Sequence, residues 1–276
     1  MLFQRLVVFL AAGIFVSSAI AQKIVAPPGW KLTWHDEFNG RDGSSPDPKK
    51  WVYDLGGSGW YNHELETYTA RTKNVRMERG NLVIEAHRED FTGVDGKPQH
   101  FTSARLKTLG RFAQQYGRFE ARIKIPQGRG AWPAFWMEGV SAAQVKWPAC
   151  GEIDIMENIP KDPGRVYSTL HGPGFGASSL LQARHDLPEG QKLADDFHVY
   201  AVEWSKEKMT FFLDGAAYGS MVLDTPEHGR DLPFDQPFFM ILNLAVGGDW
   251  PGPPDASTQF PLRMLVDYVR VYAKKN

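Results

Sequence analysis

The stretch Arg118–Ile125 reads RFEARIKI, and its apolar residues fall on every second position. Side chains alternate between the two faces of a β-strand, so this pattern predicts a strand with one buried face. A second such region follows later in the chain. Phe197–Trp204 (FHVYAVEW) is separated by a short polar stretch from Met209–Leu213 (MTFFL). This order of strand, turn and strand is typical of a β-hairpin.

The whole chain of 276 residues shows the same preference for short strands. Long helical periodicity is missing, and the 27 glycines and 19 prolines supply frequent turns. Aromatic residues make up 13% of the chain, a content that argues against disorder. No internal repeat or low-complexity linker divides it. We therefore expect one all-β domain over residues 22–276, folded as a two-sheet antiparallel β-jelly-roll sandwich.

The N-terminal 21 residues, MLFQRLVVFLAAGIFVSSAIA, have the pattern of a signal peptide. Arg5 precedes the apolar stretch Leu6–Val16, and the small residues of Ala19–Ala21 follow it. We expect cleavage after Ala21 and a secreted or periplasmic mature protein. A transmembrane anchor is the alternative, but the apolar stretch is shorter than the about 20 residues that span a bilayer.

Charge and cysteine content narrow the classes of partner. The 31 Lys and Arg residues balance 32 Asp and Glu residues, and the net charge is -1. Loss of Arg5 with the signal peptide leaves -2, so no basic field would attract nucleic acid. We expect no membrane partner after cleavage, and a monomer. Cys150 is the only cysteine and cannot form an internal disulfide, so we expect it to be a small buried hydrophobic residue.

The most informative stretch for chemistry is Trp147–Asn158, which reads WPACGEIDIMEN. On a regular strand Glu152 and Asp154 share one face, and Glu157 points to the opposite face with the two isoleucines. An unpaired charge on the core face is costly. One extra residue near Met156, a β-bulge, would return Glu157 to the face of the other two acids. The sequence therefore predicts three carboxyl groups on one accessible surface.

Three neighbouring carboxylates cannot all ionise freely, so at least one pKa should rise. Glycoside hydrolysis uses such a set, in which one acid protonates the leaving oxygen while another attacks or activates water. Two other uses stay open, the binding of a hard cation and an ordinary solvated strand face. Indole rings suit the apolar faces of sugars, and we expect at least one of Trp132, Trp136 and Trp147 to line a binding cleft.

Seven stretches, in fixed order, carry a family resemblance. They are Trp34–Phe38 (WHDEF), Trp60–Glu64 (WYNHE), Tyr116–Glu120 (YGRFE), Trp132–Trp136 (WPAFW), Glu152–Glu157 (EIDIME), Asn243–Gly248 (NLAVGG) and Val266–Tyr272 (VDYVRVY). With these motifs the chain resembles glycoside hydrolase family 16 and, within it, the bacterial laminarinase-like endo-β-1,3-glucanases. The resemblance covers almost all of the chain that follows the signal peptide.

The resemblance implies a jelly roll whose concave sheet forms the glycan cleft, and a retaining mechanism. By position, Glu152 resembles the nucleophile and Glu157 the general acid/base. Asp154 resembles the acid between them that hydrogen-bonds Glu152 and tunes its protonation. Retention requires the two working carboxyl groups to lie about 5–5.5 Å apart.

Other positions resemble binding residues of the family. Asn62, Glu64 and Arg105 resemble residues that hydrogen-bond sugar hydroxyls on the glycone side, although Arg105 could instead be a surface charge. His171 resembles a histidine near the catalytic centre, with a structural histidine as the alternative. Trp250 resembles a residue at the cleft border, with the pinning of a loop as the alternative.

No cofactor is implied for catalysis, but many family members hold a structural calcium ion on the convex face. The matching positions are Glu37, Gly80 and Asp267, the first two through backbone carbonyls. Oxygen ligands from both chain ends could staple an exported domain that has no disulfide.

The function that the resemblance implies is hydrolysis of β-1,3-glucan by double displacement, with mixed-linkage β-glucan as a further substrate. Family lichenases carry an unbulged E-x-D-x-E motif, so the additional Met156 argues against a dedicated lichenase. Two alternatives remain. One is a hydrolase of another polysaccharide, such as an agarase, carrageenase or porphyranase, and the other is a non-catalytic β-glucan-binding protein.

Overall fold

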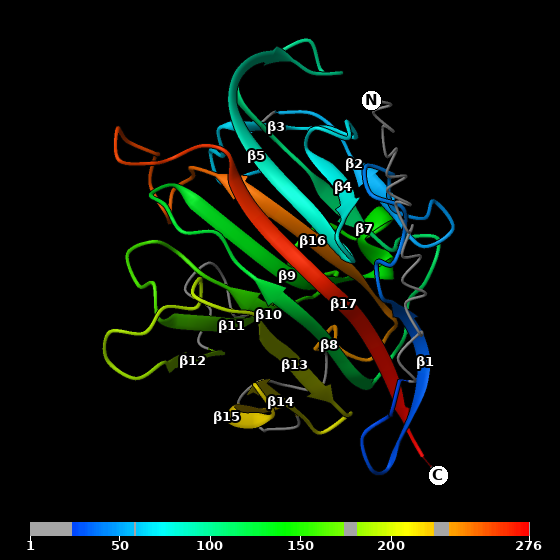
Figure 1. Ribbon diagram of the computed structural model, residues 1–276. Helices are drawn as coiled ribbons and strands as arrows, with labels where there is room; N and C mark the ends of the chain where they lie inside the picture. The colour runs from blue at the N-terminus through cyan, green and yellow to red at the C-terminus, as the bar shows by residue number, and fades with distance from the viewer. Residues whose placement is uncertain (1–23, 58, 174–180, 224–231, 276) are drawn as a thin grey trace, which may run out of the picture.

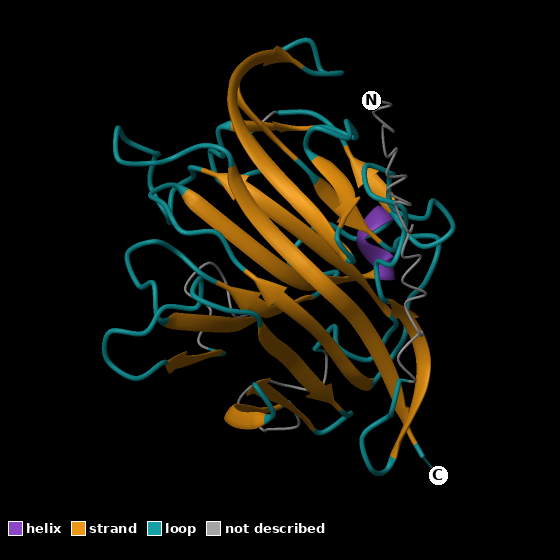
Figure 2. Cartoon of the chain, viewed as in Figure 1, coloured by secondary structure: helices purple, strands orange, loops and turns teal. Residues whose placement is uncertain are grey.

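The computed structural model describes residues 24–57, 59–173, 181–223 and 232–275. In these ranges the chain forms 17 strands and one short 3-10 helix, η1 (Val140–Ala143). The strands form two stacked sheets, with β17, β8 and β5 in one layer and β16, β9 and β10 in the other (Figure 1). Apart from one short helix, Figure 2 shows only strands and the loops that join them in these ranges. The predicted all-β jelly roll is therefore confirmed.

The larger sheet has ten strands in the order β15-β14-β13-β8-β17-β5-β6-β3, with β1 paired to β17 and β4 paired to β5. Its strands are β1 (Trp30–Asp36), β3 (Glu66–Tyr68), β4 (Val75–Glu78), β5 (Asn81–Thr92), β6 (Pro98–Ser103), β8 (Gly117–Lys124), β13 (His198–Trp204), β14 (Lys208–Leu213), β15 (Ala216–Val222) and β17 (Leu262–Lys274). Neighbours run antiparallel except β3 and β6, which are parallel.

The smaller sheet has seven strands in the order β12-β11-β10-β9-β16-β7-β2. They are β2 (Val52–Asp54), β7 (Arg105–Lys107), β9 (Ala131–Gly139), β10 (Glu152–Glu157), β11 (Arg165–His171), β12 (Gln182–Asp186) and β16 (Phe238–Val246). One face packs on the larger sheet, with β16 against β5 and β6 and β10 against β13. The face turned away from that core is called the open face below.

The strands predicted from alternation are present. In β8 the residues Phe119, Ala121 and Ile123 are fully buried in the core. The other face of β8 is not freely solvated, because Arg118 and Glu120 are nearly buried and their side chains pair at 2.9 Å. The predicted hairpin is β13–β14.

The signal peptide expected at residues 1–21 lies outside the described residues. Within the described ranges, no helix combines the length and apolar character needed to cross a membrane.

Candidate active site

A β-bulge in β10 brings three acids to the open face. Asp154 and Met156 pair with neighbouring residues of β9, so Ile155 is the extra residue. Ile155 and Met156 are both buried in the core between the sheets. After two successive core residues, the next side chain returns to the other face. Glu157 therefore lies on the open face with Glu152, and the predicted bulge is confirmed.

Two tryptophan indoles hold the outer acids. The Trp147 Nε1–H donates to Glu152 Oε2 over 3.0 Å, and the Trp132 Nε1–H donates to Glu157 Oε1 over 2.9 Å. Trp147 is 49% exposed, so much of its ring is open to a ligand. Each indole fixes a carboxyl group and leaves an aromatic surface beside it.

His171 and Asp154 form the centre of the site. In β11, His171 lies opposite Glu152. Its Nε2 is 3.0 Å from Asp154 Oδ2 and 3.6 Å from Glu152 Oε1. Ligand atoms of these three residues lie within 4.8 Å of one another, a spacing that a cation could also use. The histidine that the sequence suggested thus contacts two of the three acids.

The pKa values of all three acids are raised. Burial, and then the charge of Asp154, raise the pKa of Glu157 to about 8. Burial raises the pKa of Asp154 to about 7, against a hydrogen bond with Glu152 that lowers it. Burial and the neighbouring Asp154 hold the pKa of Glu152 well above its usual range. At neutral pH the site therefore holds a protonated Glu157 beside a pair of acids that shares a proton.

An aromatic wall surrounds Glu157. The Trp250 ring lies 5.6 Å from Trp132 and 5.0 Å from Tyr167, both edge to face. Trp250 is also 38% exposed, so it both borders the open face and anchors its loop. The sequence did not indicate Tyr167, which β-sheet pairing places opposite Glu157.

Arg105 is not a free surface charge. Its guanidinium carbon lies 4.7 Å from the Trp136 ring and 4.9 Å from the Trp60 ring. Its Nε is 3.0 Å from a carboxylate oxygen of Asp54. The two rings and the acid fix the orientation of the guanidinium, which suits bidentate contacts to sugar hydroxyls. Neither Trp60 nor Asp54 was predicted as a site residue.

Asn62 and Glu64 belong to a continuous hydrogen-bond chain. The Asn62 side-chain amide donates to Glu64 Oε1, and the Tyr68 hydroxyl donates to Glu64 Oε2, both over 3.1 Å. The Asn243 amide donates to the Tyr68 oxygen over 3.1 Å, and the Trp136 indole donates to Asn243 Oδ1 over 2.7 Å. Three of the four tryptophans named from the sequence, Trp132, Trp136 and Trp147, thus donate to polar groups of the site.

A fourth acid, Glu138, was missed by the sequence analysis. It lies in β9 opposite Glu152, and burial raises its pKa. The Cys150 thiol donates to Glu138 Oε1 over 3.6 Å. Cys150 is fully buried, as predicted, and burial raises its pKa to about 12, so the thiol is unsuited to nucleophilic attack.

The residues expected to hold calcium lie on the other sheet, and arginines engage their side chains. Arg270 donates to both carboxylate oxygens of Glu37, over 2.9 and 2.7 Å. Arg122 donates to Asp267 over 2.8 Å. Gly80 has a φ of +74° in the turn between β4 and β5. A cation here would have to use backbone carbonyls and share the Asp267 carboxylate with Arg122, so the calcium site stays a prediction.

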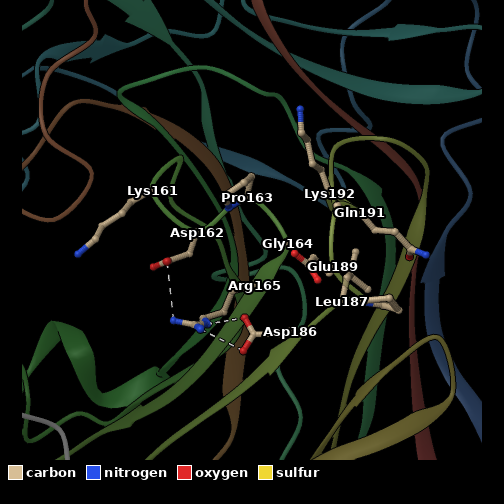
Figure 3. Close-up of a pocket in the computed structure, with 12 residues that line it drawn as sticks. Lys161, Asp162, Pro163, Gly164, Arg165, Asp186, Leu187, Glu189, Gln191 and Lys192 are labelled. Carbon is tan, nitrogen blue, oxygen red and sulfur yellow. Dashed lines mark hydrogen bonds and ion pairs between the residues drawn. The ribbon is translucent and has the colours of Figure 1, made fainter.

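One cavity lies apart from these residues. It has a volume of about 300 Å³ and opens between residues 161–165 and 186–192. In Figure 3, Arg165 reaches toward Asp162 and Asp186, and its Nε is 2.7 Å from Asp186 Oδ1. The described lining contains none of the site residues predicted from the sequence, and its central charges neutralise one another.

The chain is similar to proteins of one family. The family model "Glycosyl hydrolases family 16" matches residues 62–270. A beta-glucanase from Rhodothermus marinus is 43% identical over 253 residues, which cover 89% of this chain and 86% of that protein. Glucan endo-1,3-beta-glucosidase A1 from Niallia circulans is 36% identical over 90% of this chain but only 38% of its own length. The laminarinase catalytic domain from Thermotoga maritima matches with a TM-score of 0.84 and 44% identity, covering 90% of this chain and 99% of that one.

Proposed function

Because the chain belongs to glycosyl hydrolases family 16 and is thus a glycoside hydrolase, we propose that it is a retaining endo-β-1,3-glucanase. Its substrate is a laminarin-like β-1,3-glucan, and mixed-linkage β-glucan is a further substrate. The relatives named as glucan endo-1,3-beta-glucosidase and laminarinase support this substrate class. The observation that carries the mechanism is the bulged β10, with Glu152, Asp154 and Glu157 on one face.

The two outer acids divide the chemistry. Ionised Glu152 attacks the anomeric carbon, while Glu157 gives its proton to the departing glycosidic oxygen. A covalent glycosyl ester on Glu152 results, and Glu157 is left as a carboxylate. Glu157 then removes a proton from water, whose oxygen attacks the anomeric carbon and releases Glu152 as a carboxylate. The raised pKa of Glu157, about 8, keeps the acid protonated for the first step.

Asp154 is proposed to control the charge of the nucleophile. It hydrogen-bonds Glu152 and contacts His171 Nε2 over 3.0 Å. A proton shared by Asp154 and Glu152 settles on Asp154 when Glu152 attacks, so the attacking oxygen carries the charge. The histidine stabilises that charge distribution without contact to the anomeric carbon.

The aromatic and polar side chains on either side are proposed to bind the glucan. Trp132, Trp136, Trp147 and Trp250 offer ring surfaces to sugar faces. The polar set that binds sugar hydroxyls on the glycone side is Asn62, Glu64 and Arg105. Because such a polymer is met outside the cytoplasm, we further propose export with cleavage after Ala21, which N-terminal sequencing of the exported protein tests.

The decisive experiment incubates purified residues 22–276 with laminarin, lichenan, agarose and carrageenan, and resolves products by size over time. A ladder of oligosaccharides from laminarin, with retained anomeric configuration by NMR, is the expected result. Fragments from a galactan alone would overturn the substrate while keeping the two glutamates. Binding to a glycan without release of reducing ends would make the protein a recognition module instead.

A further inference from the structure

The hydrogen-bond chain at the glycone side runs in one direction. The Trp136 indole donates to Asn243, the Asn243 amide donates to Tyr68, and the Tyr68 hydroxyl donates to Glu64. A tyrosine hydroxyl has one hydrogen, and here it points at Glu64. Asn62 donates to the other oxygen of the same carboxyl group. Glu64 is therefore the terminal acceptor, a role that an ionised carboxylate fills best.

Behind Glu64 lies a second acid, Glu66, which the mechanism does not use. Glu66 is fully buried at the start of β3. Its Oε2 accepts the backbone N–H of Val246 over 2.7 Å. Its Oε1 has no hydrogen-bond donor among the described residues, and its carboxyl group lies close enough to that of Glu64, two positions earlier, for the two groups to affect each other's pKa. A buried oxygen without a donor, beside another carboxylate, is the atom expected to carry a proton itself.

The surrounding charges support this arrangement. Burial raises the pKa of both acids, and for Glu66 the charge of Glu64 raises it further. For Glu64, hydrogen bonds from Glu66 and Asn62 and the positive charge of Arg105 act in the opposite direction. Tyr68 is the other titratable group at this point, with a pKa held well above 10 by burial. The shared proton therefore resides on Glu66.

We infer that Glu66 is a positioning residue whose proton is donated to Glu64, fixing Glu64 as the ionised end of the hydrogen-bond chain that orients Asn62 and Trp136. The inference rests on the proposed glucan-binding function of Asn62, Glu64 and Trp136, called the glycone wall below. Its consequence is specific. When Glu66 loses its proton, two buried charges face each other and the glycone wall loses its fixed geometry, so the affinity for substrate falls.

The test measures binding in a protein that cannot turn over. In a Glu157→Gln background, the Kd for laminarihexaose is measured by calorimetry from pH 6 to pH 10. A second protein carries Glu66→Gln as well, because an amide donates to Glu64 at every pH and still accepts from Val246. We expect the Kd of the first protein to rise about tenfold across the alkaline range, the value of one charge-assisted hydrogen bond. The Kd of the second protein should stay within twofold of its value at pH 6 over the same range.

The other acids of the site titrate alike in both proteins, so the difference between the two isolates Glu66. An equal loss of affinity in both would overturn the inference. Infrared spectroscopy of the unliganded proteins provides a readout independent of substrate, because a protonated buried carboxyl has its own C=O band. The difference spectrum between the two proteins should contain one such band, lost with Glu66→Gln, because Asp154 and Glu152 contribute equally to both spectra. Identical spectra would show that Glu66 carries no proton and would overturn the inference. If the spectra differ as expected but neither protein binds laminarihexaose, only the proposed substrate is refuted.

Discussion

Acidic residues on the two outer faces of the sandwich have opposite properties. On the ten-stranded sheet, Glu78 lies 2.7 Å from Arg263 and 2.8 Å from Arg76, and the hydrogen bond from Arg263 lowers its pKa. On the open face of the other sheet, Glu157 has an indole as its hydrogen-bond donor, and burial raises its pKa to about 8. Both residues are glutamates, and the hydrogen-bond partner and burial of each side chain decide whether it is ionised.

The comparison teaches how the open face differs from an ordinary polar surface. Arginine partners keep an acid ionised at all working pH values, which suits a structural ion pair. Within the described residues, Glu152, Asp154 and Glu157 form no ion pair with Arg or Lys, and His171 is their nearest base. The environment of Glu157 thus favours its protonated form, whereas the arginines around Glu78 favour the ionised form, so only the first acid is suited to proton transfer near neutral pH.

The largest expected effect separates the two faces by activity. Glu152→Gln and Glu157→Gln should each lower kcat on laminarin by roughly 10³-fold or more, because each removes a group from the two-step reaction. Glu78→Gln should stay within about twofold of wild type. Reducing-end release at saturating laminarin measures all three.

Rescue sorts the two roles. Azide should restore turnover to Glu157→Ala with a glycosyl azide of retained configuration, because it attacks the glycosyl ester on Glu152, and to Glu152→Ala with one of inverted configuration, because it replaces Glu152 as the nucleophile. Near-normal turnover of either glutamine variant without rescue would contradict the assignment.

The second effect is on pH dependence. The alkaline limb of kcat/KM should lie near pH 8, because Glu157 must be protonated in the free enzyme. The charge of Asp154 contributes to that high value, so Asp154→Asn should move the limb to lower pH by about one unit. Initial rates at low laminarin concentration between pH 5 and pH 10 measure the shift. An unmoved limb would mean that Asp154 does not act on Glu157.

A third effect is on stability, with opposite signs on the two faces. The folded pKa of Glu157 is raised, so its stabilising contribution is present below the unfolded pKa and lost as pH rises toward about 8. Glu157→Gln should therefore raise the free energy of unfolding at pH 9 by roughly 1 kcal/mol, and Tm by a few degrees, and change both little at pH 5.

Glu78 provides the matched control. Its folded pKa is lowered, so its contribution is present above the unfolded pKa and lost as pH falls through the folded value. Glu78→Gln should lower the free energy of unfolding at pH 7 by about 0.5 kcal/mol or less, with a correspondingly small fall in Tm, and the loss should vanish at acid pH. If Glu157→Gln and Glu78→Gln changed Tm in the same direction at pH 9, the proposed difference between the two acids would be wrong.

Features that depend on residues close together in the sequence could be predicted from it, and features that depend on distant residues could not. Alternation and the bulge are local, so β8, β10 and the three acids were predicted from a dozen neighbouring residues. Tyr68 and Asn243 are 175 positions apart and lie on strands of different sheets, β3 and β16, so only the packing of the two sheets brings them together. Glu138 was missed for the same reason, because its position opposite Glu152 depends on how β9 and β10 pair. Glu66 was missed because its burial depends on packing against β16.

A last expected effect concerns the face where the acids are paired. If calcium binds at Glu37, Gly80 and Asp267, it must share the Asp267 carboxylate with Arg122, which donates to it over 2.8 Å. That competition limits the affinity for calcium.

Millimolar calcium should then raise Tm by a few degrees over the chelated protein, since about tenfold excess over Kd stabilises by roughly 1.4 kcal/mol. Asp267→Asn should abolish the shift, and Glu37→Gln should retain it, because the backbone carbonyl and not the side chain of Glu37 is the expected ligand. Equal melting with calcium and with chelator would show that arginine alone neutralises Asp267.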